Sequence, residues 1–432
     1  MATYNSQQQD AISRLESQAI QAHRAGRVQE YLACWNRILE IDPVHVRTLT
    51  AVGQHAFQRA DFQGALDAFK KVTDSSGTDP QDWVNLALAY QQLGQEKDEA
   101  SAIERALKIA PDYLLALLLK GARCERMGLR HDAARAFGAA AAVAPNPEHL
   151  PPDLRAPVQH ARTYKQEYDR MCGEFLDAHL EATYKAFSGE NLKRFRDSVD
   201  IMVGRKRRYD SWSHGHHYPG LPAIEFLDRE EFPWLDAFEK ETDSIREEFL
   251  EILKSEDGFT PYISYPDGMP LNQWAELNNS PRWSAFHMFK HGKRLDANAD
   301  RAPRTMALLA TAPQPVQPGR TPAAMFSLLK PKTRIPPHTG ISNARLVTHV
   351  PLIIPENCGF RVGNETRQWV PGQAFVFDDT IEHEAWNDSD KLRVVLIFDI
   401  WHPMLSEAER ALISMLADGL NRFTGELGGS DL

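Results

Sequence analysis

The sequence has little cysteine, no long apolar run and no excess of basic charge. Its four cysteines are far apart and form no Cys-x-x-Cys pair, which argues against a disulfide framework or a zinc–thiolate site and fits reduced thiols in a cytoplasm. The net charge of -10 argues against nucleic acid as a partner, because such binding needs a basic face. No stretch approaches the roughly 18 apolar residues of a membrane span, and the first residues do not resemble a secretory signal. We therefore expect a cytoplasmic protein without a membrane span.

A 34-residue period runs through the first 150 residues. Small residues recur at that interval at Gly26, Ala60, Gly94 and Gly128. Aromatic residues follow by nine positions at Trp35, Phe69 and Phe137, and prolines follow by 17 positions at Pro43, Pro111 and Pro145. A small residue suits a tight turn between two helices, an aromatic ring fills the space between them, and proline ends the second helix. In the second copy the proline is displaced to Pro80, which predicts a lengthened loop in TDSSGTDP.

This pattern resembles the tetratricopeptide repeat, with about four copies over residues 10–146. We therefore assign residues 1–150 to an all-α repeat domain. The resemblance implies a concave surface that binds a peptide or a partner protein. A structural platform or a dimerisation surface remains the alternative, because repeats define architecture and not a ligand.

Residues 151–215 are interpreted as a helical linker, with a helix over 158–187. Where the linker ends, the segment SHGHHYPG places His214, His216 and His217 together, but without the spacing of a defined metal site. A surface segment is therefore the favoured interpretation. A further helix is expected from about Pro233 to Lys254. Its apolar stripe would cover a sheet: Leu235, Phe238, Ile245, Phe249 and Ile252.

The pattern changes to short strands from Ala323 onward. AMFSLLKP, ARLVTHVPLII, GFRVG, TRQWV, QAFVF and LRVVLIFDIW are rich in β-branched and aromatic residues, and turn-forming residues separate them. Six to eight such strands predict an antiparallel double-sheet jelly roll, which we assign to residues 216–432 together with flanking helices. The mouth of such a barrel can hold a metal and one small ligand.

Polar residues interrupt these strands at positions that suit a site. His338 follows two prolines, His383 lies in FDDTIEHEAW, and Arg393 begins an otherwise apolar strand. A buried arginine needs an anion, and its rigid fork suits a carboxylate. Two histidines separated by a loop and a strand suit a divalent transition metal. Arg345 and His349 share one face of their strand, because side chains alternate along it.

The segments PHTGISNARLVTH, GNETRQW and FVFDDTIEHEAWNDSDKLRVVLIFDIWHP resemble the aspartyl/asparaginyl β-hydroxylase family, a group of Fe(II)- and 2-oxoglutarate-dependent oxygenases. The resemblance covers roughly residues 215–405 and is densest over 325–403. It implies a double-stranded β-helix fold and a hydroxylase that uses iron, 2-oxoglutarate and O₂ as metal, cosubstrate and oxidant.

The same resemblance assigns roles to individual residues. His338 and His383 would be the iron ligands. Ser327 and Arg393 would hold the distal carboxylate of 2-oxoglutarate, and His349 would reach the end near the metal. Arg345 would contact the carboxylate of the cosubstrate or of the substrate.

Two positions qualify the family pattern. Gly340 stands where many such oxygenases carry a third, carboxylate ligand, so water would complete the iron site. Four acidic residues lie near His383 in sequence, and support of the histidines is the favoured role for them, with a third metal ligand among them as the alternative: Asp378, Asp379, Glu382 and Glu384. Val347 stands where the family often carries arginine, which leaves the substrate open.

The primary expectation is hydroxylation at the β-carbon of an aspartyl- or asparaginyl-type residue in a peptide or protein. One alternative keeps the enzyme class and replaces the substrate by a small molecule, a free or carrier-bound amino acid, or a lipid. A second alternative is a non-catalytic repeat scaffold with a ligand-sensing barrel.

Overall fold

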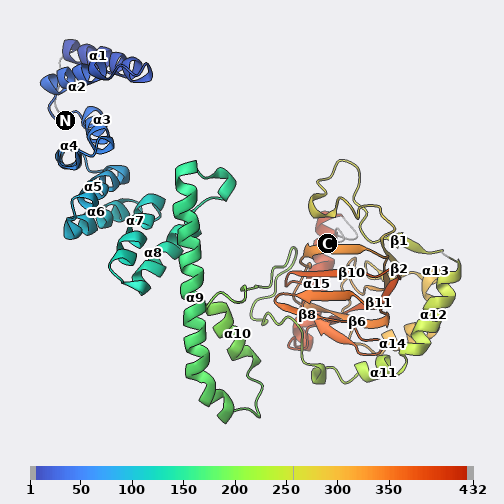
Figure 1. Ribbon diagram of the computed structural model, residues 1–432. Coiled ribbons are helices and arrows are strands. Elements are labelled where there is room, and N and C mark those ends of the chain that lie inside the picture. The colour runs from blue at the N-terminus through green and yellow to red at the C-terminus, as the bar shows by residue number, and fades with distance from the viewer. Residues whose placement is uncertain (1–5, 256, 426–432) are drawn as a thin grey trace. The chain divides into compact units, whose positions relative to one another are not determined.

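The computed structural model describes residues 6–255 and 257–425. The chain divides into two compact units, one ending at Arg205 and one beginning at Lys206. Figure 1 shows that the first is helical and that the second is built on β-sheets. No helix among the described residues has the length and apolar character that crossing a membrane requires.

Helices of the first unit follow one another as helix–turn–helix pairs. Their bounds are α1 (Ser6–Arg24), α2 (Val28–Ile41), α3 (Val46–Gln58), α4 (Phe62–Ser75), α5 (Pro80–Gln92), α6 (Glu96–Ile109), α7 (Leu114–Arg126), α8 (Arg130–Val143), α9 (Pro152–Ala186) and α10 (Lys193–Met202). The strongest packing joins α1 to α2, α3 to α4, α5 to α6 and α7 to α8. This confirms the predicted tetratricopeptide-type solenoid.

The turns within these pairs explain the 34-residue period. The small residue of each turn has a positive φ: 68° at Gly26, 62° at Ala60, 68° at Gly94 and 71° at Gly128. Glycine adopts this conformation without steric cost, whereas Ala60 must tolerate it.

The aromatic positions fill the space between paired helices, as the period predicts. A Cβ atom added to Gly53 would lie 2.4 Å from the ring of Phe69, and one added to Gly121 would lie 2.4 Å from the ring of Phe137. Each ring therefore lies directly against the backbone of the preceding helix.

One detail of the repeat was wrong. The loop after α4 comprises residues 76–79, as long as the loops at 42–45 and 110–113. Pro80 is instead the first residue of α5, where a missing N–H costs no hydrogen bond, and Asp79 caps that helix by accepting from the Gln81 N–H. The displaced proline changes its role and leaves the loop length unchanged.

The linker helix is longer than the sequence predicts. Helix α9 begins at Pro152 rather than at residue 158, and Val158 and Ala161 pack against Phe137 and Ala140 of α8. Pro152 occupies its first turn, and Pro157 is accommodated inside it. Residues 206–215 lie in the second unit.

The second unit contains two antiparallel sheets. Within residues 257–425 the larger has the order β1-β2-β4-β11-β6-β9, with β3 paired to β2, and the smaller has the order β5-β10-β7-β8. The strands are β1 (Phe259–Pro261), β2 (Trp283–Lys290), β3 (Lys293–Arg294), β4 (Ala324–Leu329), β5 (Thr333–His338), β6 (Arg345–Ile353), β7 (Cys358–Val362), β8 (Glu365–Arg367), β9 (Phe375–Phe377), β10 (His383–Asn387) and β11 (Arg393–Trp401). The predicted double-stranded β-helix is confirmed.

The two faces of the larger sheet serve different purposes. Even-numbered residues such as Phe326, Leu396 and Phe398 face a core shared with helices α11 (Leu235–Lys240) and α12 (Thr242–Ser255). Figure 1 shows these helices, with α13 (Asp296–Ala299) and α14 (Pro303–Leu309), at the edge of the sheets. The odd-numbered residues of β4, β6 and β11 face the smaller sheet instead, and the polar candidates lie among them.

The predicted helix over 233–254 is two helices that meet at Glu241. The apolar stripe is nevertheless as expected: Leu235, Phe238, Ile245, Phe249 and Ile252 are all buried. Phe238 stacks on Phe398, with ring centroids 5.0 Å apart. The break between the helices bends the stripe, and it still covers one sheet.

Candidate active site

The two candidate metal ligands lie side by side on the smaller sheet. His338 ends β5 and His383 begins β10, and the register pairs these two residues directly. Their ring centroids are 4.0 Å apart. The prolines before His338 do not prevent the pairing, which resumes at Ile335 opposite Ala385 across an irregular step.

The backbone fixes both imidazole rings. The Nδ1 atom of His338 lies 2.8 Å from the Pro336 carbonyl oxygen, and that of His383 lies 3.0 Å from the Ile381 carbonyl oxygen. Since a carbonyl oxygen only accepts, each Nδ1 donates its proton, and each Nε2 keeps its lone pair. Both rings line the same cavity, so two Nε2 lone pairs are available to one ligand.

Both histidines are neutral at physiological pH. Burial and, to a smaller extent, the neighbouring His383 lower the pKa of His338 to about 3. Burial is also the main reason that the pKa of His383 falls to about 4. Neutral imidazole is the form that binds a metal, so the site is electrostatically prepared for one.

Asp379 fills the space that Gly340 leaves. A Cβ atom added to Gly340 would lie 2.2 Å from Asp379 Oδ2, and the Gly340 N–H donates to the Asp379 carbonyl at 2.6 Å. The Oδ1 atom of Asp379 is buried and has no hydrogen-bond partner in the described part of the chain. Residues 6–255 and 257–425 contain no cluster of three or more metal-binding side chains. Asp379 nevertheless lies close enough to His338 for its carboxylate to raise the pKa of that histidine.

Arg393 is a buried cation with no carboxylate partner among the described residues. It begins β11 and is 1% exposed, and its Nη1 is 3.3 Å from Ser327 Oγ and 3.4 Å from the Ser327 carbonyl oxygen. Its guanidinium lies 4.6 Å from the centre of the Trp369 ring. Its Nε is buried without a partner among the described residues, and burial lowers its pKa to about 10. A buried arginine in this condition is costly unless a ligand supplies an anion.

His349 lies between this arginine and the histidine pair. Its Nδ1 accepts a hydrogen bond from the Trp369 Nε1–H at 3.2 Å, so the proton of the neutral ring is on Nε2. Burial, followed by the positive charge of Arg393, keeps the pKa of His349 well below 6.5. The ring is therefore a neutral donor facing the cavity.

Arg345 is paired with two carboxylates. It donates from Nη2 to Asp379 Oδ2 at 2.9 Å and from Nη1 to Asp399 Oδ1 at 2.8 Å. Burial raises the pKa of Asp399 to about 6, and Arg345 opposes this rise. The sequence analysis expected Arg345 to contact a ligand carboxylate, and the structure assigns it protein partners.

A cavity of about 680 Å³ unites the predicted site. All six predicted residues line it: Ser327, His338, Arg345, His349, His383 and Arg393. The sequence analysis missed Trp283, Asp399 and Arg320, which also line it, and Trp369, which contacts both His349 and Arg393. The only sequence signal for Asp399 was an acidic residue inside the apolar strand LRVVLIFDIW.

Other polar candidates lie outside the cavity. Asp378 accepts from the Thr380 backbone N–H and hydroxyl, at 2.9 and 2.5 Å. Glu382 and Glu384 both pair with Arg361, at 3.0 and 2.6 Å. By contrast, His214 and His216, which the sequence analysis gave little weight, line the cavity wall.

Comparisons with known proteins agree with this geometry. Residues 239–403 match the model of the family described as Aspartyl/Asparaginyl beta-hydroxylase. The human aspartyl/asparaginyl beta-hydroxylase is 26% identical over 81% of this chain and 47% of its own length. The ornithine lipid ester-linked acyl 2-hydroxylase of Rhizobium tropici is 34% identical over 44% of this chain and 64% of its own length. The chain thus spans less than two thirds of either relative.

A crystal structure of MamA protein shares 19% identity and a TM-score of 0.32, covering 41% of this chain and 94% of that one. This likeness is too low to say anything about function. The predicted site residues, in contrast, all lie within the range matched by the family model, residues 239–403: Ser327, His338, His349, His383 and Arg393. The part of this chain that holds the histidine pair is thus similar to the aspartyl/asparaginyl beta-hydroxylase family.

Proposed function

We propose that the protein is an Fe(II)- and 2-oxoglutarate-dependent oxygenase that hydroxylates an unactivated C–H bond. The observation that carries the proposal is the pairing, in one cavity, of two neutral histidines with a buried arginine that has no counter-anion in the described chain. The first set suits a divalent transition metal, and the second suits a dicarboxylate. A site that held only a metal would not need Arg393.

The residues present fit both groups. His338 and His383 would hold iron through Nε2, because their Nδ1 atoms are bonded to the backbone. The unpartnered Oδ1 of Asp379 faces the same space and would accept a hydrogen bond from a metal-bound water. Asp379 would thus support the iron site while Arg345 holds its other oxygen.

The cosubstrate would be held at the opposite end. Arg393 and the Ser327 hydroxyl would bind its distal carboxylate, and the Nε2–H of His349 would donate toward its other end. The Trp369 ring would keep the guanidinium in place and exclude water from it. These contacts orient the cosubstrate before any reaction occurs.

When bound, iron supplies the oxidative chemistry, in which O₂, 2-oxoglutarate and R–H are converted to succinate, CO₂ and R–OH. The chain supplies open coordination positions, orientation and a cavity lined by the residues that hold the ligands. The names of both relatives denote hydroxylases, which supports the same class of reaction here.

The test is succinate formation from 2-oxoglutarate by the purified protein, with and without Fe(II), under air and under nitrogen. We expect succinate only when iron and oxygen are both present, and loss of that signal in His338→Ala. An iron-binding protein that makes no succinate with any substrate class would favour the ligand-sensing alternative.

We also propose that the repeats bind a peptide or partner protein. A cavity of about 320 Å³ opens between α1, α2 and α3, and Trp35, His23 and Arg24 line it. Its mixed aromatic and basic lining suits an extended acidic peptide. Substituting Arg24→Glu should weaken capture of such peptides and leave succinate formation unchanged.

A further inference from the structure

We infer that Arg320, together with the wall formed by residues 211–218, is an anion-binding site that holds an acidic group of the substrate. This inference rests on the proposed function, because only that function makes the bound anion part of a substrate. It assigns a second cationic point in the cavity, separate from the cosubstrate anchor Arg393.

Arg320 is presented by a tightly bonded turn. The Gln317 N–H donates to the Thr321 carbonyl at 3.0 Å, and the Arg320 N–H donates to the Gln317 carbonyl at 3.0 Å. Asn421 fastens the turn from helix α15 (Glu407–Thr424) by donating to the Pro318 carbonyl at 2.6 Å. The turn leads directly into β4, so the position of Arg320 relative to the sheet is fixed.

The Arg320 side chain faces the cavity, and no ion pair joins it to a carboxylate of the described residues. It lines the cavity, and its Nε is buried and unpartnered within residues 6–255 and 257–425. Three arginines line the cavity, and of these Arg345 alone is bonded to carboxylates of the described chain. Arg320 and Arg393 are thus both able to accept an anion from a ligand.

A strap over residues 211–218 adds polar groups beside Arg320. The strap runs along the loop after His338: the His214 N–H donates to the Gly340 carbonyl at 3.1 Å, and the Gly215 N–H donates to the Ile341 carbonyl at 2.9 Å. Asn343 closes its far end by bonding both the N–H and the carbonyl of Tyr218, at 2.7 and 2.9 Å. The strap is therefore a fixed part of the cavity wall.

The histidines of the strap lie in the field of Arg320. A Cβ atom added to Gly215 would be 3.8 Å from Arg320 Nη1. Burial lowers the pKa of His216, and the charges of Arg320 and His217 lower it further. The guanidinium of Arg320 thus places a positive charge beside this part of the wall, and that charge attracts an anion.

The wall between the two cationic points is apolar. From Arg320 the chain runs along β4 past Met325 to Ser327, the partner of Arg393. In β11, Ile397 pairs with Met325 of β4. Two residues further along β11, Asp399 pairs with Val347 of β6. All three apolar side chains line the cavity. The substrate that fits carries an oxyanion, a carboxylate or a phosphate, joined to an apolar segment that presents the reacting C–H.

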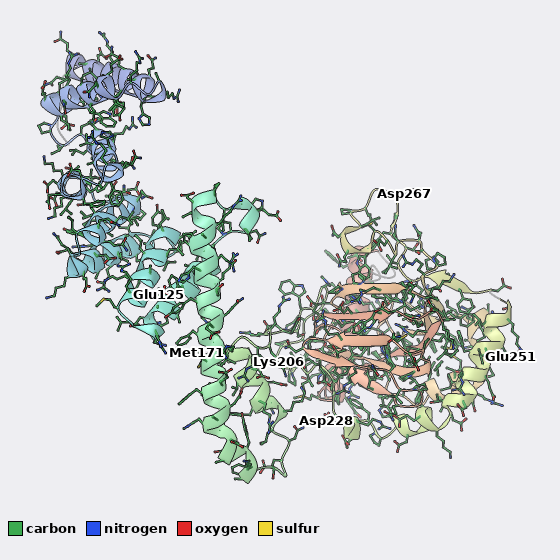
Figure 2. All side chains as sticks on the ribbon, in the orientation of Figure 1. Glu125, Met171, Lys206, Asp228, Glu251 and Asp267 are labelled. Atoms are coloured by element: carbon green, nitrogen blue, oxygen red, sulfur yellow. The ribbon has the colours of Figure 1, made fainter. Side chains whose placement is uncertain are left out.

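The opposite rim of the cavity is also lined by apolar side chains, which suits the apolar segment of such a substrate. Tyr265, Met269 and Trp274 line the cavity from the loop that contains Asp267, which is labelled in Figure 2. Met269 is 50% exposed, although it is a large apolar residue. An exposed thioether at a cavity rim suits contact with a flexible apolar chain.

Isothermal titration calorimetry on the full chain tests the inference with three probes that share one alkyl chain: octanoate, octyl phosphate and octanol. The protein is first loaded with Mn(II) and saturating 2-oxoglutarate. We expect at least one anion to bind at least about tenfold more tightly than octanol, because a charge-assisted contact contributes on this scale. The two anions distinguish a carboxylate ligand from a phosphate ligand.

Substitutions locate the binding. Arg320→Gln should remove the preference for the anion, and Arg320→Lys should retain most of it. Arg294→Gln is the matched control, because Arg294 is an exposed arginine paired with Asp296 and Asp300, and it should change nothing. Loss of preference in the control as well would contradict the assignment.

The Arg393→Gln variant, titrated without 2-oxoglutarate, separates this inference from the proposed function. If Arg393→Gln still binds an alkyl anion more tightly than octanol, the assignment of the anion to Arg320 is supported. This holds even if the wild type fails to bind 2-oxoglutarate. Preference lost in Arg393→Gln and kept in Arg320→Gln would overturn the inference, since the anion would then occupy the cosubstrate anchor. An aspartyl peptide that binds more tightly than either alkyl anion, unaffected by Arg320→Gln, would overturn it as well.

Discussion

Replacing Arg393 by methionine should stabilise the ligand-free protein while it abolishes cosubstrate binding. Burial without a carboxylate partner lowers the pKa of Arg393 from its ordinary value to about 10. At about 1.4 kcal/mol for each tenfold change in proton affinity, the charge destabilises the folded state by about 3 kcal/mol. Methionine keeps much of the side-chain volume and removes the charge, so most of this destabilisation should disappear.

The destabilisation of the folded state by the Arg393 charge depends on pH. The folded state holds the Arg393 proton less tightly than the unfolded state, so the penalty is complete below about pH 10 and declines as the pH rises above that value. At pH 7 the whole difference between Arg393 and methionine should therefore be visible.

Scanning calorimetry of the full chain, with and without 2-oxoglutarate and Mn(II), provides the measurement. For a unit of this size about 3 kcal/mol corresponds to a rise of roughly 6–10 °C in the transition of the sheet-containing unit. The ligands should raise that transition in the wild type and leave it unchanged in Arg393→Met.

Arg345→Met is the matched contrast. Arg345 lines the same cavity but is bonded to Asp379 and Asp399, so its removal leaves two buried carboxylates unpaired. We expect a loss of about 3–5 kcal/mol for that variant. If both variants lowered the transition, an anion or contact within the protein would be compensating Arg393, and the argument for a ligand carboxylate would fail.

Further expectations concern the metal site and the repeats. Co(II) affinity, followed by its absorbance, should stay nearly constant from pH 7.5 to 5.5, because the pKa values of His338 and His383 are about 3 and 4; a tenfold fall centred near pH 6.5 would refute this. Gly340→Asp should destabilise the fold by about 1–3 kcal/mol through its clash with Asp379, and the double variant with Asp379→Gly should recover much of that loss in a thermal melt. Gly121→Val should lower the melting temperature of the helical unit and leave succinate formation unchanged, since its side chain would meet the ring packed against that glycine.

Periodic features were predictable from the sequence, because the same residue type recurs wherever the same backbone conformation or sheet face requires it. The 34-residue interval places a positive φ at every turn, and the alternation in β6 places Arg345 and His349 on one face. The break between α11 and α12 was not predictable, because the apolar stripe continues across it.

The candidate site was predictable only in part. The six residues named from the sequence all line one cavity, since a resemblance to a known family carried their positions. Their partners were not predictable: Trp369 reaches His349 across 20 positions, and Asp399 reaches Arg345 across 54. Contacts over such separations follow from the strand order, which no local pattern contains. Arg320 was missed because a single arginine in a turn has no periodicity to distinguish it.

The two sheets contribute unlike halves of the cavity, and this has a mechanical consequence. The histidine pair belongs to the smaller sheet, whereas Ser327, His349 and Arg393 belong to the larger one. A ligand that contacts both sets spans the gap and acts as a removable tie between the sheets. Loading with metal and cosubstrate should then slow amide exchange in β5 and β10 together with β4 and β11, although these two pairs of strands belong to different sheets. Without ligands, the two sheets would open locally more often. With metal and cosubstrate bound, the barrel would be more rigid, and a substrate could be aligned against it.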